Sequence, residues 1–221
     1  MKFTKENLNL ETGIDKEWVI TNGIGGFASS TIIGANTRKY HGLLIATLNP
    51  PASRFLVLSK LDESLEIRGK KYDLYTNICE SFISHGYKYQ EEFEKDYYPT
   101  FKYNVNGVEI EKSICMEYNQ NTVGVHYKIK NGRYKSKLTL APIVNFRDFH
   151  TMNTGHHFNI RQQVNDTKVK LVIDEKSQTP VYMNLSEGKY IIHDNDTFNN
   201  MFYVEEEKRG FYPEENHAVP G

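Results

Sequence analysis

The 221-residue sequence predicts an all-β protein, folded as a large antiparallel β-sandwich. Short apolar segments with period-two alternation recur along the chain and are separated by turn residues. Aromatic residues make up 13% of the chain, mainly 15 Tyr and 12 Phe, and such residues favour the pleated, half-buried surfaces of sheets. No segment combines a helix N-cap, a long helical period and a C-cap. Since no repeat or linker-like tract divides the sequence, we expect a single domain over residues 1–221.

The first half of the chain predicts an antiparallel meander. Asn106-Gly107 indicates a type I′ hairpin turn, because both positions of that turn need positive φ angles. The aromatic residues in the segment 89–97 also fit the spacing of one helix face, but we predict a strand there, which ends before Pro99. The predicted strands of this half are residues 40–47, 54–61, 89–97, 101–105, 108–118, 122–130 and 136–144.

The second half continues the same alternation and predicts strands over residues 157–164, 168–173, 180–185, 189–193 and 201–204. Trp18 is expected in the core, and Cys79 and Cys115 are expected as small buried hydrophobes.

Composition excludes several classes of protein. Lys and Arg number 27 against 28 Asp and Glu, and this net charge of −1 gives no attraction to nucleic acid or to an anionic membrane. A mean hydropathy of −0.61 does not fit a transmembrane chain. The N-terminal residues have no apolar signal-peptide region, so we expect a cytoplasmic protein. Two cysteines and the adjacent His156 and His157 do not match a metal-ligand spacing, and we expect neither a metal nor a cofactor.

The segment over residues 18–44, WVITNGIGGFASSTIIGANTRKYHGLL, is rich in glycine. Gly23, Gly25 and Ala28 have the spacing of a dinucleotide fingerprint, but the β-branched residues that follow do not open the helix which that site requires. One interpretation is that the glycines serve tight turns and close backbone approach. The other is that the polar run at residues 36–41 clamps a carboxylate or sugar hydroxyls through Arg38, Tyr40 and His41.

Candidate catalytic carboxylates are all better explained by structural roles. Hydrolysis of a glycosidic bond needs two carboxyl groups about 5–10 Å apart. Asp62 and Glu63 are adjacent on a predicted strand and therefore point to opposite faces. Asp194 and Asp196 lie in a predicted turn, and residues 205–209 are interpreted as a solvated charge cluster. Arg147 and His150 follow a predicted strand, where a loop can project them; the alternative is a weak local pair of Arg147 with Asp148.

Three stretches carry a resemblance to a known family: the glycine-rich segment quoted above, LNPPASRFLVLSKLDESLEI and PIVNFRDFHTM. They resemble the N-terminal domain of bacterial and archaeal glycogen debranching enzymes of the amylo-α-1,6-glucosidase type. The resemblance implies a β-supersandwich like the one that precedes the catalytic barrel of glucoamylase-type enzymes. It also implies a following (α/α)-barrel that carries the paired carboxylates. The sequence stops before such a barrel, so we expect a fragment that is inactive in isolation, from a parent glycoside hydrolase.

The expected function is that of a non-catalytic module. It packs on the catalytic barrel of the same polypeptide and contacts an α-glucan such as glycogen, with no nucleic-acid or membrane partner. Two alternatives stay open: a stand-alone carbohydrate-binding module, suggested by the tyrosine excess, and an epimerase-like enzyme using His41, Asp148 and His150 for proton transfer. The candidate contact residues are Asn22, Gly23, Gly25, Gly26, Asn36, Thr37, Arg38, Tyr40, His41, Arg147 and His150.

Overall fold

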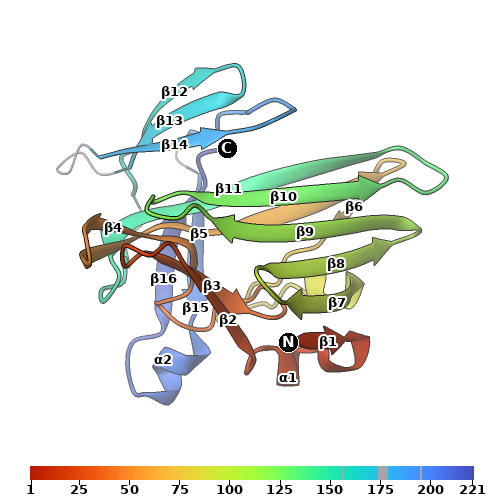
Figure 1. The fold of residues 1–221 in the computed structure, drawn as a ribbon, viewed down its shortest axis with the longest axis horizontal. Helices are drawn as coiled ribbons and strands as arrows, with labels where there is room; N and C mark the ends of the chain where they lie inside the picture. Colours follow the sequence, from red (N-terminus) through yellow and green to blue (C-terminus); the bar gives the residue numbers. More distant parts are fainter. Residues whose placement is uncertain (156, 174–178, 195) are drawn as a thin grey trace.

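Strands dominate the structure, a computed structural model that describes residues 1–155, 157–173, 179–194 and 196–221. Two antiparallel sheets lie face to face, and a smaller third sheet lies at one end of them (Figure 1). The predicted all-β class and the antiparallel sandwich are therefore confirmed.

The front sheet has the strand order β1-β7-β8-β9-β10. Asn106 and Gly107 join β8 to β9 with φ angles of 49° and 84°, as the type I′ turn requires. The outer face of this sheet is highly charged, and Lys102 lies opposite both Glu92 and Glu111. Its strands are β1 (Lys2–Thr4), β7 (Gln90–Lys95), β8 (Pro99–Val105), β9 (Val108–Met116) and β10 (Val123–Lys130).

The back sheet has the order β15-β16-β11-β5-β4-β3-β2, with β6 paired to the far half of β5. The two longest strands, β5 and β11, pair along most of their length and form its centre. Its strands are β2 (Glu17–Thr21), β3 (Phe27–Thr31), β4 (Gly42–Asn49), β5 (Ala52–Ile67), β6 (Lys70–Asp73), β11 (Ser136–Asp148), β15 (Thr197–Phe202) and β16 (Glu214–Ala218).

The small sheet consists of β12 (Arg161–Asn165), β13 (Lys168–Val172) and β14 (Pro180–Asn184). Short helical turns complete the described chain: η1 (Lys5–Asn7), α1 (Leu10–Gly13), η2 (Gly86–Tyr89) and α2 (Val204–Lys208). Within the described residues, no helix has the length and apolar character needed to cross a membrane.

The main core lies between the front and back sheets. Trp18 is buried there, as predicted: its ring meets Phe101 edge-on at 6.3 Å, and its indole N–H donates to the Thr31 carbonyl at 3.1 Å. Alternate residues of β9 point into this core, including Ile110 and Ile114, because successive side chains of a strand face opposite ways. A second cluster lies between the small sheet and β11.

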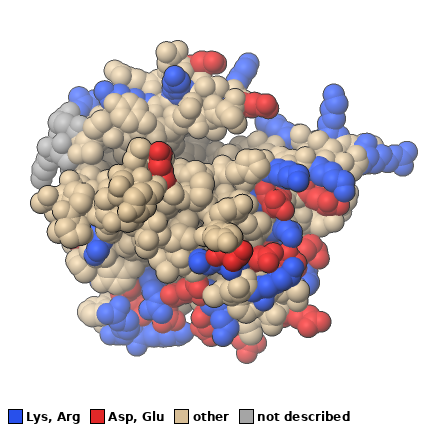
Figure 2. All heavy atoms as spheres, viewed as in Figure 1, with Lys and Arg blue, Asp and Glu red and all other residues tan. Residues whose placement is uncertain are grey.

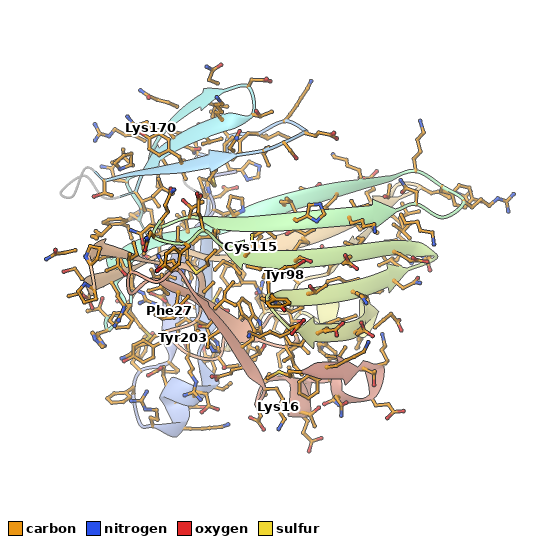
Figure 3. The ribbon with its side chains drawn as sticks, in the orientation of Figure 1. Lys16, Phe27, Tyr98, Cys115, Lys170 and Tyr203 are labelled. Carbon is orange, nitrogen blue, oxygen red and sulfur yellow. The ribbon has the colours of Figure 1, made fainter. Side chains whose placement is uncertain are left out.

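Several predicted elements differ from the observed ones. Residues 189–193 form no strand; this segment instead meets the chain end, where the His193 N–H donates to the Pro220 carbonyl at 2.8 Å. The strand predicted over residues 157–164 begins only at Arg161. The one predicted over 201–204 covers only the last two residues of β15, because α2 begins at Val204. Cys79 is buried as predicted, but Cys115 lies exposed on β9 (Figure 3), where the prediction is wrong.

Candidate functional site

Three turns meet at one end of the sandwich, and Asn22 holds two of them together. The turn at residues 22–26 joins β2 to β3, and the buried Asn22 side chain accepts hydrogen bonds from the N–H groups of Gly26 (2.9 Å) and Ile24 (3.2 Å). Its amide also donates to the Gln120 carbonyl at 2.9 Å, in the turn between β9 and β10. Asn121 of that turn pairs with both backbone groups of Thr47 on β4. We call this the loop end, comprising residues 22–26, 49–52 and 117–122.

The glycines of the loop end serve tight turns and close approach, which confirms the first interpretation of the glycine-rich segment. Gly23 and Gly25 have φ angles of +83° and +102°, which L side chains rarely adopt. A Cβ at Gly23 would lie 2.5 Å from the Tyr118 ring, and one at Gly25 would lie 2.7 Å from the Pro51 carbonyl oxygen. Gly26 packs equally closely on the Asn22 amide.

An open groove of about 410 Å³ lies beside these glycines. Arg54 borders it and donates from Nε to the Gly25 carbonyl at 2.6 Å. The left end of the molecule in Figure 2, where β4 and these turns lie, is largely free of charged side chains, whereas charges gather over the front sheet. The groove is lined by Val19, Thr21, Gly23, Gly25, Gly26, Phe27 and Arg54.

An aromatic cluster adjoins the groove, with Phe149 at its centre. The Phe149 ring lies 6.5 Å from that of Phe27, 5.4 Å from Tyr40 and 4.1 Å from the exposed His150. The Tyr40 hydroxyl and His150 Nδ1 are 3.3 Å apart, and the Arg54 guanidinium lies over the Phe149 ring at 5.5 Å. Figure 3 shows Phe27 on the left side of the sandwich. Tyr40 and His150, both predicted contact residues, are thus brought together beside the glycine turn.

Other predicted residues lie beneath this surface and support it. Asn36 is buried and bonds the Ser30 and Ser59 hydroxyls, at 2.9 and 3.1 Å. His41 is only 2% exposed, and its Nδ1 accepts the Thr37 N–H at 3.0 Å, which leaves Nε2 as the protonated nitrogen of the neutral ring. Thr37 is also fully buried. These three side chains shape the loop and present no surface to a ligand.

Arg38 is held in an ion pair with Glu17. Its Nε lies 2.6 Å from Glu17 Oε1, and its Nη2 lies 3.5 Å from Glu205 of α2. His41 Nε2 is 3.6 Å from the same Glu17 oxygen, slightly beyond hydrogen-bond distance. His41 and Arg38 together lower the pKa of Glu17 to about 2. Arg38 therefore ties the polar loop to β2 and α2.

Arg147 is a buried anchor, and the predicted surface pair with the Asp148 side chain is wrong. Arg147 belongs to β11 and forms a bidentate pair with Glu215 on β16, with Nη2 2.7 Å from Oε2. The same Nη2 donates to the Lys39 carbonyl at 2.8 Å, so this pair fixes the backbone beside Tyr40. Burial lowers the pKa of the neighbouring His217 to about 4.

Glu215, the partner of Arg147, was missed by sequence reasoning, because it lies 68 residues further along the chain. Glu215 is fully buried and accepts the Tyr203 hydroxyl at 2.6 Å, besides Arg147. Burial acts to raise the pKa of Glu215, but the charges of His217 and Arg147, and then the hydrogen bonds from Arg147 and Tyr203, keep it below its ordinary value.

Glu206 was expected in a solvated charge cluster, and this prediction is also wrong. The Glu206 side chain is fully buried on α2 and accepts the Lys39 N–H at 3.4 Å. Its second oxygen lies 3.6 Å from Arg209 and 3.9 Å from the Lys39 ammonium. The polar loop is thus fastened to α2 as well as to β11.

Comparison with known proteins decides the family. A family model described as glycogen debranching enzyme, N-terminal, matches residues 16–221. The chain belongs to the glycogen debranching enzyme N-terminal family. The resemblance drawn from the sequence motifs is thereby confirmed. No curated protein and no solved structure gives a match.

Within this debranching-enzyme domain, the adjacent carboxylates of β5 have separate structural partners, as the strand geometry predicts. Asp62 accepts the Asn77 amide at 2.6 Å and lies 3.4 Å from Lys60. Glu63 instead accepts Lys112 and the Tyr127 hydroxyl. The Asp196 carboxylate lies 3.2 Å from His193 Nδ1.

No group of three or more His, Cys, Asp or Glu side chains in the described part of this debranching-enzyme domain could hold a metal ion. His156, one half of the adjacent histidine pair, lies outside the described residues.

Proposed function

We propose that this chain is the non-catalytic N-terminal module of a glycogen debranching enzyme. In this proposal a catalytic domain of the same polypeptide hydrolyses α-1,6 branches in the cytoplasm. The module packs on that domain and contacts the glucan through its loop end and the aromatic cluster of Tyr40, Phe149 and His150 beside it. Membership of the family supports the module assignment.

The observation that carries the proposal is the convergence of Tyr40, Phe149 and His150 beside a groove that bears almost no charge. Aromatic rings with polar edges suit ligands that have both apolar faces and hydroxyl groups, as sugars do. The cluster is exposed on one side and fixed on the other by Arg147 and Glu206, which bind the two backbone groups of Lys39. A site on such a rigid base loses little entropy when it binds.

The carboxylates support a module without catalysis of its own. Glu63, Glu206 and Glu215 are buried and bound to cationic or hydroxyl partners. None of the three faces the groove, so no carboxylate pair at the loop end is arranged for general acid and base work.

The test uses the debranching enzyme that contains this module. We expect His150→Ala and Tyr40→Ala to raise KM for a branched limit dextrin several-fold, with kcat for a small soluble substrate unchanged. Tyr97→Ala is the matched control, because Tyr97 is 87% exposed and lies outside both the aromatic cluster and the loop end. Unchanged KM in both cluster variants, with thermal unfolding also unchanged, would refute the proposed contact.

A stand-alone carbohydrate-binding module is the second candidate, favoured by the openness of the groove and by the exposed ring of Tyr118 beside it. It predicts glycogen binding by the isolated chain. The epimerase-like alternative receives no support from the geometry, because His41 is buried and its Nδ1 is occupied by the Thr37 N–H.

A further inference from the structure

Three Asn-Gly pairs occur in the sequence, beginning at Asn22, Asn106 and Asn131. Such a pair can lose its side-chain amide spontaneously, because the backbone nitrogen of the glycine can attack the Asn Cγ and no glycine side chain obstructs its approach. The attack needs a backbone N–H that is free and a carboxamide that can turn toward it. The structure places the three pairs in very different surroundings.

Asn22 is held on every polar atom of its side chain. Its Oδ1 accepts the N–H groups of Ile24 and Gly26, and its Nδ2 donates to the Gln120 carbonyl at 2.9 Å and to Asn121 at 3.2 Å. The residue is also fully buried, away from the water that the reaction consumes. The Asn22 carboxamide cannot turn without breaking these hydrogen bonds.

Asn106 is exposed, but both groups that would react are already occupied. The Gly107 N–H, which carries the attacking nitrogen, donates to Asn104 Oδ1 at 3.1 Å. The Asn106 Nδ2 donates to the Tyr72 hydroxyl at 2.7 Å. Both hydrogen bonds must break before the nitrogen can reach Cγ.

Asn131 is free of such restraints. It lies with Gly132 in the exposed connection between β10 and β11, at the end of the sandwich opposite the loop end (Figure 1). Among the described residues, no hydrogen bond uses the Gly132 N–H or the Asn131 Nδ2. The nucleophile and the leaving group are therefore both available.

Two neighbours of Asn131 also favour the reaction. Negative charge develops on Oδ1 as the Gly132 nitrogen attacks Cγ, and the Ser136 hydroxyl already donates to this oxygen at 2.7 Å. Arg133 follows the pair, and its guanidinium lies over the Tyr134 ring rather than against a carboxylate of the described residues. A nearby cation favours the deprotonated form of the attacking nitrogen.

We propose that Asn131 is a deamidation site of the folded chain, assisted by the Ser136 hydroxyl. The Gly132 nitrogen forms a bond to Asn131 Cγ and gives up its proton. The bond between Cγ and Nδ2 then breaks, and ammonia leaves with that proton. Water opens the resulting succinimide at either of its carbonyl groups, which produces aspartate or isoaspartate at position 131. Both products put a carboxylate beside Arg133, and isoaspartate lengthens the backbone between β10 and β11.

The experiment incubates the 221-residue chain in mildly alkaline buffer. Each Asn-Gly pair is followed by mass spectrometry of chymotryptic peptides, and isoaspartate is counted by enzymatic methylation. We expect Asn131 to convert first. Asn106 should convert at least about tenfold more slowly, because two hydrogen bonds must break first, and Asn22 should stay unchanged. In urea, where these contacts are lost, the three pairs should convert at similar rates. A folded chain that converts Asn131 no faster than Asn106 would overturn the proposal.

Asn106 is the matched control for the hydrogen-bond argument. Asn104→Ala frees the Gly107 N–H, and Tyr72→Phe frees the Asn106 amide while it keeps the ring. The double variant should convert Asn106 about tenfold faster than the parent chain does. An unchanged rate at Asn106, with an unchanged unfolding temperature, would show that these hydrogen bonds do not cause the selectivity and would overturn the argument.

The part assigned to Ser136 has its own test. Ser136→Ala should slow the conversion of Asn131 about twofold to tenfold, the range for one hydrogen bond, and Ser136→Thr, which keeps a hydroxyl, should restore it. In urea Ser136→Ala and the parent should convert alike. An unchanged or faster rate in folded Ser136→Ala would overturn the assistance by this hydroxyl. Isoaspartate that persists at the parent level in Asn131→Gln would place the modification elsewhere in the chain.

Discussion

Replacing Glu63 by glutamine should destabilise the fold by about 3–5 kcal/mol, the usual cost of leaving one member of a buried ion pair without its partner. Lys112 lies on the inward face of β9 between Ile110 and Ile114, and its ammonium is bound to Glu63 across the core. The two side chains are 9% and 6% exposed. The adjoining cavity is only about 20 Å³, room for about one water, so solvent gives the stranded Lys112 little help.

A loss of this size corresponds to a fall in Tm of about 6–20 °C for a chain of this length. Urea unfolding at pH 7 measures it directly. Glu109→Gln is the matched control, since Glu109 pairs with Lys130 at 3.3 Å on the exposed face of the same sheet, where a pair contributes little. The double variant Glu63→Gln, Lys112→Met should recover much of the loss, because it removes both charges and retains an acceptor for Tyr127. A single variant within about 1 kcal/mol of the parent, or a double variant no better than the single, would refute the reasoning.

Three further predictions concern pH, backbone and surface charge. The pKa of His217 is lowered to about 4, so between pH 6.5 and 4 the unfolded chain binds a proton that the folded chain does not. The free energy of unfolding should therefore fall by about 3 kcal/mol as the pH drops from 6.5 to 4. In His217→Asn, the urea midpoint should depend less on pH over this range. Gly25→Ala should lower the free energy of unfolding by about 2 kcal/mol or more, because the φ angle of Gly25 is +102° and the Pro51 carbonyl leaves no room for a Cβ. Gly107 also has a positive φ angle but faces open space, so Gly107→Ala should lower it by less in the same urea assay. Lys102→Met should change stability by about 1 kcal/mol or less, and the difference should shrink in salt, because Lys102 is exposed and its partner Glu92 is only half-buried on the outer face of the sheet.

Strands could be predicted where buried and exposed residues alternate regularly along the sequence. Asn106-Gly107 and the alternation around it gave β8 and β9 almost to their observed bounds, because turn chemistry and strand period are both local. Residues 189–193 have a strand-like composition but find their partner in the chain end, at Pro220. Local pattern contains no information about such a distant partner, and this is why that prediction failed.

Several residues of the candidate site could be predicted from the sequence, but which of them are buried and which are exposed could not. Tyr40 and His41 are neighbours in one polar run, yet Tyr40 reaches the surface cluster and His41 is buried, because Nδ1 of His41 turns inward to the Thr37 N–H. An irregular loop has no regular backbone period, so the direction of each side chain cannot be predicted from its position in the sequence. Tyr118 and Arg54 were missed because their importance comes from turns that meet only in three dimensions.

Long-range ion pairs explain why a loop with so many polar residues can have a fixed shape. Arg147 and Glu215 are 68 residues apart in sequence, and Arg38 and Glu17 are 21 apart. Each pair crosses between elements, and Arg147 also binds the Lys39 carbonyl at 2.8 Å. Burying charges such as those of Arg147 and Glu215 adds little net stability, but removing one partner of such a pair is costly, so the pair favours one conformation over its alternatives. The buried Arg147–Glu215 pair therefore fixes the backbone beside Tyr40, and the aromatic cluster that we propose as a contact site has its shape before any ligand binds.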